Sequence, residues 1–277
     1  MKNIKKIRLT LAAVVANIVV LSIYAVPFLF VLLNSFKDKR GASQMKMSWP
    51  EVFHPENYID VANTPGSNLF VAFKNSMIIT VMAVVLTIFL CSTVAFYIQR
   101  RNDRSSKILN SLLMIGLMVP VAVMPTIWVL QALNLYRLKL GLVFVQVAVG
   151  IPFSMMLFRS YIATIPKEID EAAILDGCGT WRLFGNIIFP ILSPVTATVI
   201  ILTAINVFND FANALYFLPG AGNATVQLTL YNFMGAYSNK WNLLFADIVI
   251  VCIPMVILFL FFNKQIVSGM TGGAVKG

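Results

Sequence analysis

The chain has 277 residues, of which 59% are hydrophobic and only 12% are charged, and its formal net charge is +10. A soluble domain usually carries about a quarter charged residues, so this composition excludes an ordinary soluble protein and indicates an integral membrane protein. The sequence contains no GxxxxGK[ST] phosphate-binding loop. It also shows no pairing of a catalytic nucleophile with a general base and no spacing typical of metal ligands. We therefore expect a chain that is not an enzyme and holds no metal or cofactor. We attribute much of the net positive charge to Lys and Arg residues that set the orientation of the chain in the membrane, and we expect no nucleic-acid partner.

Six apolar runs are long enough to cross a hydrocarbon core about 30 Å thick. Only α-helices and closed β-barrels satisfy all backbone hydrogen-bonding groups in lipid. The sequence of a barrel would show short segments in which apolar and polar residues alternate, not long apolar runs. We therefore predict an all-α, polytopic membrane helical bundle that forms one transmembrane domain over residues 1–277. The first run follows four basic residues, as a secretory signal does, but it exceeds the roughly 7 to 15 apolar residues typical of one; a cleaved signal is the alternative. The spans are expected at about 11–33, 70–97, 108–131, 140–162, 191–217 and 243–263.

Lysine and arginine are unevenly divided between alternate loops. The N-terminus, residues 100–107, residues 159–182 and the C-terminal tail hold 13 of them, and the other set of loops holds 8. Because cytoplasmic loops carry the excess of Lys and Arg, the first set is predicted to be cytoplasmic. We expect a multi-pass protein of the cytoplasmic membrane with both termini inside.

A charged segment at about 164–190 separates the fourth and fifth runs and is predicted to form a helical hairpin on the cytoplasmic face. Acidic residues favour the start of its first helix, and Asp176-Gly177 favour the end of that helix. Thr180 is expected to cap a second helix with an apolar ridge. Such a ridge fits a groove in a partner protein or, alternatively, lies on the membrane surface as an interfacial helix. The ridge residues recur at i, i+3 and i+7: Trp181, Phe184 and Ile188.

The fifth run carries a polar stripe among apolar residues. Polar side chains inside a membrane usually face the interior of the bundle or a wet cavity. Amides and a carboxylate beside Phe208, Phe211 and Tyr216 suit a sugar, which offers hydroxyls and apolar ring faces, so the stripe is a candidate substrate pathway. The alternative is that these side chains hydrogen-bond neighbouring helices as packing contacts. The stripe consists of Asn206, Asn209, Asp210 and Asn213, at i, i+3, i+4 and i+7.

The hairpin also carries a longer pattern, which resembles the EAA motif of ABC importer permeases. Its residues are Glu171, Ala172, Ala173, Asp176, Gly177, Phe184, Ile187, Pro190 and Pro194. The resemblance extends to Asn75-Ser76, to Ala95 and Tyr97 before Arg100, and to Gly273–Gly277, and it is to the smaller maltose-type subunit of the carbohydrate-uptake subfamily. Phe189 stands where many relatives have Leu, an apolar exchange that we expect to be tolerated.

This resemblance implies a permease subunit of an ATP-driven, binding-protein-dependent sugar or oligosaccharide importer in a bacterial cytoplasmic membrane. The subunit would form half of the translocation pathway and work by alternating access. The implied partners are a second homologous permease, two ATPase subunits that hold ATP and Mg, an extracytoplasmic sugar-binding protein, the sugar substrate and the lipid membrane. The hairpin would dock on the ATPase, and the residues implied in this coupling are Glu171, Ala172, Ala173, Asp176, Gly177, Trp181 and Phe184.

The resemblance also implies two further contacts. The outer segment 218–241 begins with a Pro/Gly turn and is nearly uncharged. It would supply a loop that enters the binding protein, with a plain connector as the alternative. The tail 268–277 would reach the ATPase dimer, with a disordered end as the alternative. The residues of the expected binding-protein loop are Gly220, Gly222, Asn223 and Thr225.

An ion-gradient-driven secondary transporter is the main alternative function. Such proteins usually show inverted repeats, broken helices and buried ionisable relays. The six runs here contain two acidic residues and no apparent repeat. A purely structural membrane anchor explains neither the polar stripe nor the hairpin.

Overall fold

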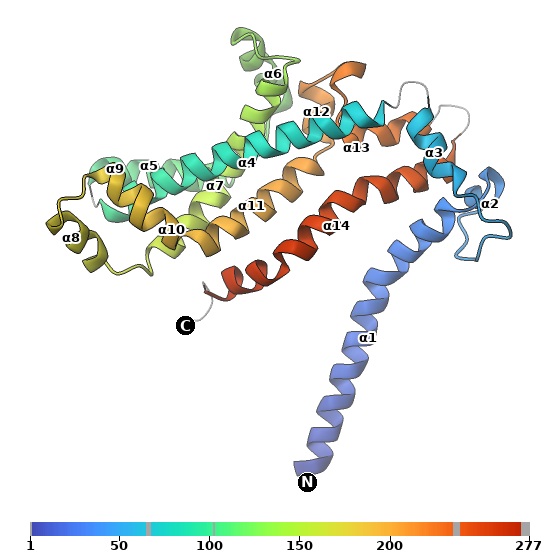
Figure 1. The fold of residues 1–277 in the computed structure, drawn as a ribbon, viewed down its shortest axis with the longest axis horizontal. Helices are drawn as coiled ribbons and strands as arrows, with labels where there is room; N and C mark the ends of the chain where they lie inside the picture. The colour runs from blue at the N-terminus through green and yellow to red at the C-terminus, as the bar shows by residue number, and fades with distance from the viewer. Residues whose placement is uncertain (1, 65–67, 102, 235–238, 273–277) are drawn as a thin grey trace. The chain divides into compact units, whose positions relative to one another are not determined.

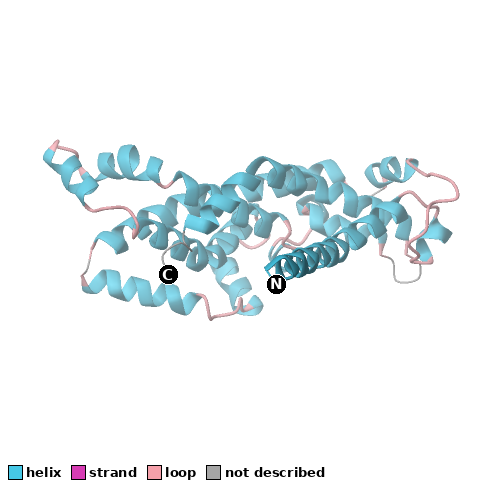
Figure 2. Ribbon diagram, turned by 90° about the horizontal axis from the view of Figure 1, so that it is seen from below, coloured by secondary structure: helices cyan, strands magenta, loops and turns pink. Residues whose placement is uncertain are grey.

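The computed structural model describes residues 2–64, 68–101, 103–234 and 239–272, and within these ranges the chain forms helices and loops without a strand (Figures 1 and 2). Two compact units divide it: residues 1–69 with 229–253, and residues 70–228 with 254–277. The predicted all-α class is thus confirmed for the described residues.

Four helices of the described ranges are long and apolar enough to cross a membrane. A fifth candidate is a pair of helices, Thr180–Ile191 and Ser193–Phe208, that bends by 75°. The prediction of several membrane-spanning helices is confirmed, but six continuous spans are not found. The four long helices are α1 (Lys2–Ser35), α4 (Leu69–Arg100), α7 (Lys139–Ile162) and α14 (Trp241–Gly272). In α1 and α14, the part long and apolar enough to cross a membrane is Ala13–Ser35 and Trp241–Phe262, respectively.

The run predicted as one span at 108–131 is instead two helices, α5 (Arg104–Gly116) and α6 (Val123–Ala132). Residues 117–122 lie between them, outside both helices. Pro120 accounts for the break, because proline has no backbone N–H to donate and its ring disfavours the helical conformation of the residue before it.

The run predicted at 191–217 is also divided, into α11 (Ser193–Phe208) and α12 (Ala212–Phe217). No proline lies at this break. Asp210 accepts a hydrogen bond at Oδ1 from the backbone N–H of Asn213, at 3.3 Å. Short polar side chains that bond to nearby backbone in this way compete with the helix, so the polar stripe itself accounts for the interruption.

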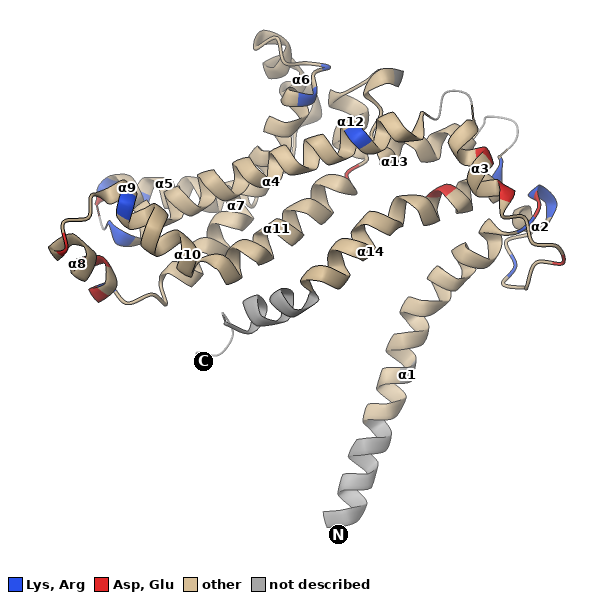
Figure 3. Cartoon of the chain, in the orientation of Figure 1, with Lys and Arg blue, Asp and Glu red and all other residues tan. Residues whose placement is uncertain are grey.

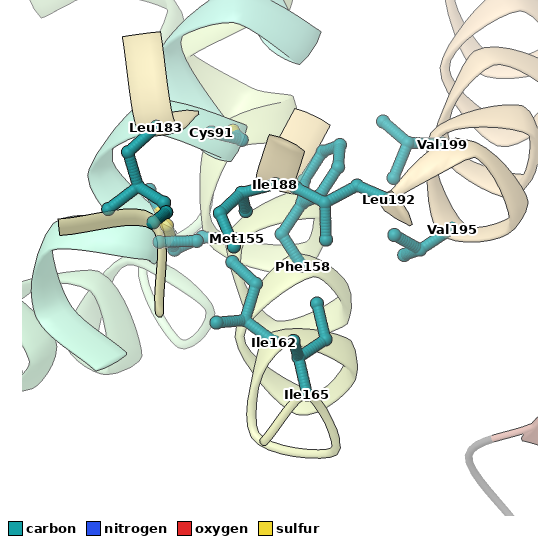
Figure 4. Packing of buried hydrophobic residues seen from close by; sticks show 12 residues of the cluster. Cys91, Met155, Phe158, Ile162, Ile165, Leu183, Ile188, Leu192, Val195 and Val199 are labelled. Carbon is teal, nitrogen blue, oxygen red and sulfur yellow. The ribbon is translucent and has the colours of Figure 1, made fainter. Parts of the chain in front are cut away.

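The unit formed by residues 70–228 and 254–277 has two apolar cores, and both involve α4 and α7. At the end that carries residues 158–192, α7 packs against the helices that follow it (Figure 4). Phe158, Ile162 and Ile188 are fully buried there, with Leu192 where α10 (Phe189–Ile191) turns into α11. At the opposite end, Leu142 and Val143 of α7 pack with Phe217 of α12.

The unit formed by residues 1–69 and 229–253 is organised around Asn57 at the start of α3 (Glu56–Asn63). The Asn57 amide donates to the carbonyl oxygens of Ser35 at 2.8 Å and Lys37 at 2.9 Å, and its Oδ1 accepts from Asn242 at 2.8 Å. These bonds join the end of α1, the start of α3 and the start of α14. Buried backbone carbonyls at a helix end need such donors, so Asn57 stabilises this corner.

Lys37, beyond the end of α1, is only 4% exposed. Its ammonium donates to Lys46 O at 2.7 Å, Asn34 Oδ1 at 3.1 Å and Ser48 Oγ at 3.2 Å. All three acceptors are neutral, and burial lowers the pKa of Lys37 below its ordinary value of 10.5. The folded protein therefore releases this proton at a lower pH than the unfolded chain does.

This burial predicts a pH-dependent contribution to stability. A lowered lysine pKa means that the penalty for the buried charge is present at low pH and is relieved as pH rises through the folded pKa toward 10.5. We expect the thermal unfolding midpoint of the detergent-solubilised protein, compared with that of Lys37→Met, to rise between pH 7 and pH 10. Lys39→Met, at an exposed position of α2 (Lys39–Ser43), is the control. A constant difference between wild type and Lys37→Met would contradict the expectation.

Candidate functional site

A cavity of about 480 Å³ lies between α7 and the interrupted helix pair α11 and α12. All four residues of the predicted polar stripe line it, although the helix is broken between them: Asn206, Asn209, Asp210 and Asn213. The opposite wall comes from α7 and includes Gln146, Phe153 and Ser154. The structure therefore brings the stripe together at one concave surface.

Two hydrogen bonds fix the Asp210 carboxylate at the cavity wall. Gln146 of α7 donates from Nε2 to Asp210 Oδ2, and the backbone N–H of Asn213 donates to Oδ1 at 3.3 Å. Next to it, Asn209 Oδ1 accepts from Gln227 of α13 (Val226–Thr229) at 3.0 Å. The sequence analysis missed both glutamines. Gln146 carried a usable signal, since it is the one amide in an otherwise apolar stretch of α7.

The cavity lining combines neutral hydrogen-bonding groups with apolar surface. Its polar side chains are amides, the hydroxyls of Ser154 and Thr203, and one carboxylate, Asp210. Phe153 adds an aromatic ring. No lysine or arginine is among the described lining residues. Figure 3 shows acidic colour at the break between α11 and α12. Such a surface suits a polar, uncharged molecule with many hydroxyls.

The segment predicted as a hairpin folds into several short helices at the end of α4 (Figure 1). The first, α8 (Glu168–Leu175), has acidic residues in its first turn and is followed by Gly177, whose φ is +81°. Next come α9 (Thr180–Arg182), a π-helical turn (Leu183–Ile188) and α10. A positive φ favours glycine, since a Cβ atom in this region clashes with the backbone. Gly177 therefore allows the chain to reverse between α8 and α9.

The predicted coupling residues of this segment differ in exposure. Trp181 is 78% exposed, while Ala173 is buried in the core with Phe158. Phe184 is partly buried and packs against Phe96 of α4, with ring centroids 5.5 Å apart and ring planes tilted by 44°. The other four residues have exposed side chains or, for glycine, an exposed backbone: Glu171, Ala172, Asp176 and Gly177.

Two details of the predicted second helix are wrong. Gly179, not Thr180, is the N-cap of α9, and no side chain caps this helix. The apolar ridge is also not continuous on the surface, because Ile188 is fully buried while Trp181 is exposed. The π-helical turn over Leu183–Ile188 is the reason, since its i→i+5 hydrogen bonding changes the angular spacing that an α-helix would give.

Arg100 and Asp170 form an ion pair that the sequence analysis missed. Arg100 Nε lies 2.6 Å from Asp170 Oδ2, and Nη2 donates to Oδ1 at 3.3 Å. Both side chains are 12% exposed. Two guanidinium nitrogens also donate to the carbonyl oxygen of Ile165, each at 3.2 Å. Asp170 is one of the acidic residues in the first turn of α8, and it also joins α8 to Arg100, the last residue of α4.

The predicted binding-protein loop lies beside the other end of α4. Gly220 has φ +125°, and Gly222 and Asn223 belong to a short 3₁₀ turn, Ala221–Asn223. Gly220 and Gly222 are exposed, while Thr225 is buried. Asn223 Nδ2 donates to the carbonyl oxygen of Arg137 at 3.1 Å. Of the tail 268–277 predicted to contact the ATPase, residues 268–272 form the end of α14, and residues 273–277 lie outside the described residues.

Comparison with known proteins adds a family to this geometry. Residues 92–272 match the family described as the binding-protein-dependent transport system inner membrane component. The chain is 33% identical over 255 residues to the probable ABC transporter permease protein YurM of Bacillus subtilis, covering 91% of this chain and 84% of that protein. It is 31% identical over 270 residues to the melibiose/raffinose/stachyose import permease protein MelC of the same species, covering 96% and 95%.

A solved structure supports the fold. The chain of a bacterial ABC transporter involved in the import of the acidic polysaccharide alginate superposes with a TM-score of 0.80 at 19% identity, covering 94% of this chain and 96% of that one. The resemblance drawn from the EAA motif is confirmed, and the importer reading is favoured over the ion-gradient-driven alternative. This chain belongs to the family of binding-protein-dependent transport system inner membrane components.

Proposed function

We propose that this chain is one of two permease subunits in an ATP-driven importer of uncharged oligosaccharides in a bacterial cytoplasmic membrane. The observation that carries the proposal is the cavity between α7 and α11, lined by the amides of the polar stripe in a chain of the permease family. Alternating access would expose this cavity to one side of the membrane at a time, since each ligand stabilises the state that it binds better.

The chemistry of the cavity supports the substrate class. Amide and hydroxyl groups donate to and accept from sugar hydroxyls, and Phe153 offers a ring for an apolar sugar face. The described lining has no basic side chain that would pair with an acidic sugar, and the Asp210 carboxylate would repel one. Relatives such as MelC are named for uncharged sugars. The solved structure that is named for import of an acidic polysaccharide is only 19% identical to this chain, so it supports the fold and not the substrate class.

The segment from α8 to α9 supports contact with an ATPase subunit. It exposes the side chains of Leu175 (88%) and Trp181 (78%), and those of Glu171 and Asp176 are exposed in the same segment. Large exposed apolar side chains together with charged ones are typical of a docking surface. ATP and Mg would be held by that partner, because this chain has no phosphate-binding loop. If the segment instead lies on the membrane surface as an interfacial helix, the chain should purify without an ATP-hydrolysing partner.

We place six crossings in this topology. The helices α5 and α6 would together make one crossing, and α10 and α11 of the bent pair another, in addition to the four long helices. Both termini and the α8–α9 segment would then lie in the cytoplasm, in agreement with the excess of Lys and Arg in those loops. The turn at 220–225 would lie outside, where it would contact the sugar-binding protein.

The test is transport by the whole complex. We expect the tagged chain to co-purify from its native membrane with a second permease and an ATP-hydrolysing subunit. We expect vesicles that contain the complex and the binding protein to accumulate radiolabelled raffinose or maltotriose only when ATP is present on the ATPase side. Uptake should persist when ionophores collapse the proton and sodium gradients, because hydrolysis supplies the energy.

Two results would contradict ATP-driven import. One is uptake that stops with the ionophores although ATP remains, which would indicate coupling to an ion gradient. The other is purification of the chain without any nucleotide-hydrolysing companion. A vesicle preparation that takes up galacturonate oligomers but neither uncharged sugar would contradict the substrate class alone.

A further inference from the structure

Helix α4 has hydrogen bonds at both ends to the two segments that the proposed function places outside the membrane. The helix runs without interruption from Leu69 to Arg100. In Figure 1, α8 and α9 lie at one end of α4, and α12 and α13 lie toward the other. At about 1.5 Å of rise per residue, the roughly 25 residues from Asn75 to Arg100 span about 37 Å, which exceeds a hydrocarbon core of about 30 Å.

At the end near α8, Arg100 is the contact. Its guanidinium reaches both oxygens of Asp170 and also the carbonyl oxygen of Ile165, so it contacts α8 and the connection that leads from α7 to α8. Both members of the ion pair are largely shielded from water. A planar guanidinium that makes several such bonds fixes orientation as well as distance. The start of α8 is therefore fixed relative to the end of α4.

At the other end, Asn75 and Ser76 are the contacts, and they are 1% and 3% exposed. Asn75 Nδ2 donates to the carbonyl oxygens of Gly222 at 3.2 Å and Ala224 at 3.0 Å. Ser76 Oγ accepts from the backbone N–H of Val226 at 2.9 Å. These three bonds hold consecutive parts of the turn 222–226 against α4. Buried polar groups satisfied in this way specify one arrangement of the backbone.

The helix between these contacts has no weak point. Among the four long helices of the described residues, α1, α7 and α14 each contain a proline, at positions 27, 152 and 254. No proline or glycine lies within α4. Sharp bends in helices almost always occur at Pro, at Gly/Ser pairs or at π-type turns. We therefore expect α4 to transmit a displacement from one end to the other without bending.

We infer that α4 holds the cytoplasmic α8 and the outer turn 222–226 as one rigid body, with Arg100 and Asn75 as the positioning residues. This inference rests on the proposed function for the location of the two segments. It gives a physical route between them: movement of α8 by the ATPase would move the outer turn with it, at an unchanged distance, through two hydrogen-bonded contacts and one helix. Neither residue needs to touch sugar or nucleotide.

The test is a distance measured by electron paramagnetic resonance between two spin labels in the purified full complex. Lys167→Cys, just before α8, and Gly222→Cys carry the labels, since both positions are exposed and a Cβ at Gly222 meets no atom within 4 Å. Cys178 and Cys252 are replaced by serine, while the fully buried Cys91 stays. We expect one narrow distance distribution whose mean changes by less than about 2 Å between nucleotide-free and ATP–vanadate states, the scale of a small helix shift.

Four variants on the same labelled background separate positioning from folding. Arg100→Ala and Asn75→Asp should broaden the distribution and make its mean depend on nucleotide. The second variant keeps the shape of the side chain but removes the donor to both carbonyl oxygens. Arg100→Lys should broaden it less, because the ammonium keeps the charge but not the planar fork. Val85→Ala is the matched control and should resemble wild type, because Val85 of α4 is 58% exposed.

The inference is overturned by a wild-type distance that changes by more than about 2 Å with nucleotide, or by Arg100→Ala and Asn75→Asp distributions as narrow as that of Val85→Ala. Failure of the proposed function would look different. A complex without ATP-dependent uptake would contradict the importer, while the width of the distance distribution in wild type and Arg100→Ala would still report whether the two segments form one rigid body.

Discussion

Replacing Gly177 by alanine is expected to reduce ATP-dependent uptake by about tenfold while the protein still inserts into the membrane. Gly177 has φ +81°, and an added Cβ would meet no atom within 4 Å, so the effect comes from backbone conformation alone. A non-glycine residue in this region costs roughly 1 to 2 kcal/mol, and about 1.4 kcal/mol corresponds to a factor of ten in an equilibrium. The population with the native turn between α8 and α9 should fall accordingly.

Two matched variants control this prediction. Gly177→Asn should lose less activity, because asparagine tolerates the left-handed region better than alanine. Gly179→Ala should transport normally, since φ at Gly179 is −71° and its surroundings are also open. Initial uptake rates, normalised to the amount of assembled complex, give the comparison. Equal rates for Gly177→Ala and Gly179→Ala would show that the turn geometry does not matter for transport.

A more severe variant, Gly177→Asp, tests the docking surface itself. It combines the strained backbone with a new carboxylate beside Asp176 on an exposed surface. We expect uptake to be abolished although the chain remains in the membrane. Normal transport by a well-expressed Gly177→Asp variant would contradict the proposed contact between this segment and an ATPase.

Sequence reasoning recovered the elements whose signal is local. The long apolar helices α1, α4, α7 and α14 follow from length and hydropathy alone, because lipid requires about 20 apolar residues for each crossing. The interruptions at Pro120 and at Asn209–Phe211 were missed. Proline and polar residues occur in membrane helices whenever neighbouring groups satisfy the freed backbone, so neither residue type decides between a bend and a continuous span.

The candidate site was predicted in part for a related reason. The spacing of the polar stripe at Asn206 to Asn213 identified one wall of the cavity. The other wall comes from α7, more than 50 residues earlier in the chain, so Gln146 could be recognised as polar but not paired with Asp210. The Arg100–Asp170 pair has the same character, since 70 residues separate its members. Long-range contacts depend on helix packing, which hydropathy and periodicity do not encode.

The second large effect is expected at Asp210. Asp210→Leu removes the acceptor for the Gln146 amide and for the Asn213 backbone N–H, and it replaces the carboxylate found among the described lining residues by an apolar group. A buried donor left without its acceptor costs roughly 1 to 3 kcal/mol, so uptake should fall by about tenfold or more. Asp210→Asn keeps one carbonyl oxygen and nearly the same shape, and it should lose less.

The kinetic pattern separates a substrate pathway from packing. If Asp210 contacts the sugar, Asp210→Asn should change the KM for radiolabelled raffinose or the range of sugars transported, with little change in the thermal unfolding midpoint. If the side chain only joins helices, the midpoint should fall and the KM should stay. Asp60→Asn, an exposed carboxylate on α3, makes the same chemical change elsewhere and should alter neither quantity.

A double-mutant cycle with Gln146 sharpens this distinction. Gln146→Leu removes the donor to Asp210 Oδ2 and leaves the carboxylate in the cavity wall with one fewer partner. Residues in direct contact commonly show coupling energies of about 0.5 to 3 kcal/mol. We expect Gln146→Leu with Asp210→Leu to reduce uptake by clearly less than the product of the single effects, because the first change already breaks the shared hydrogen bond. Multiplicative effects would mean that the two side chains act independently on the sugar.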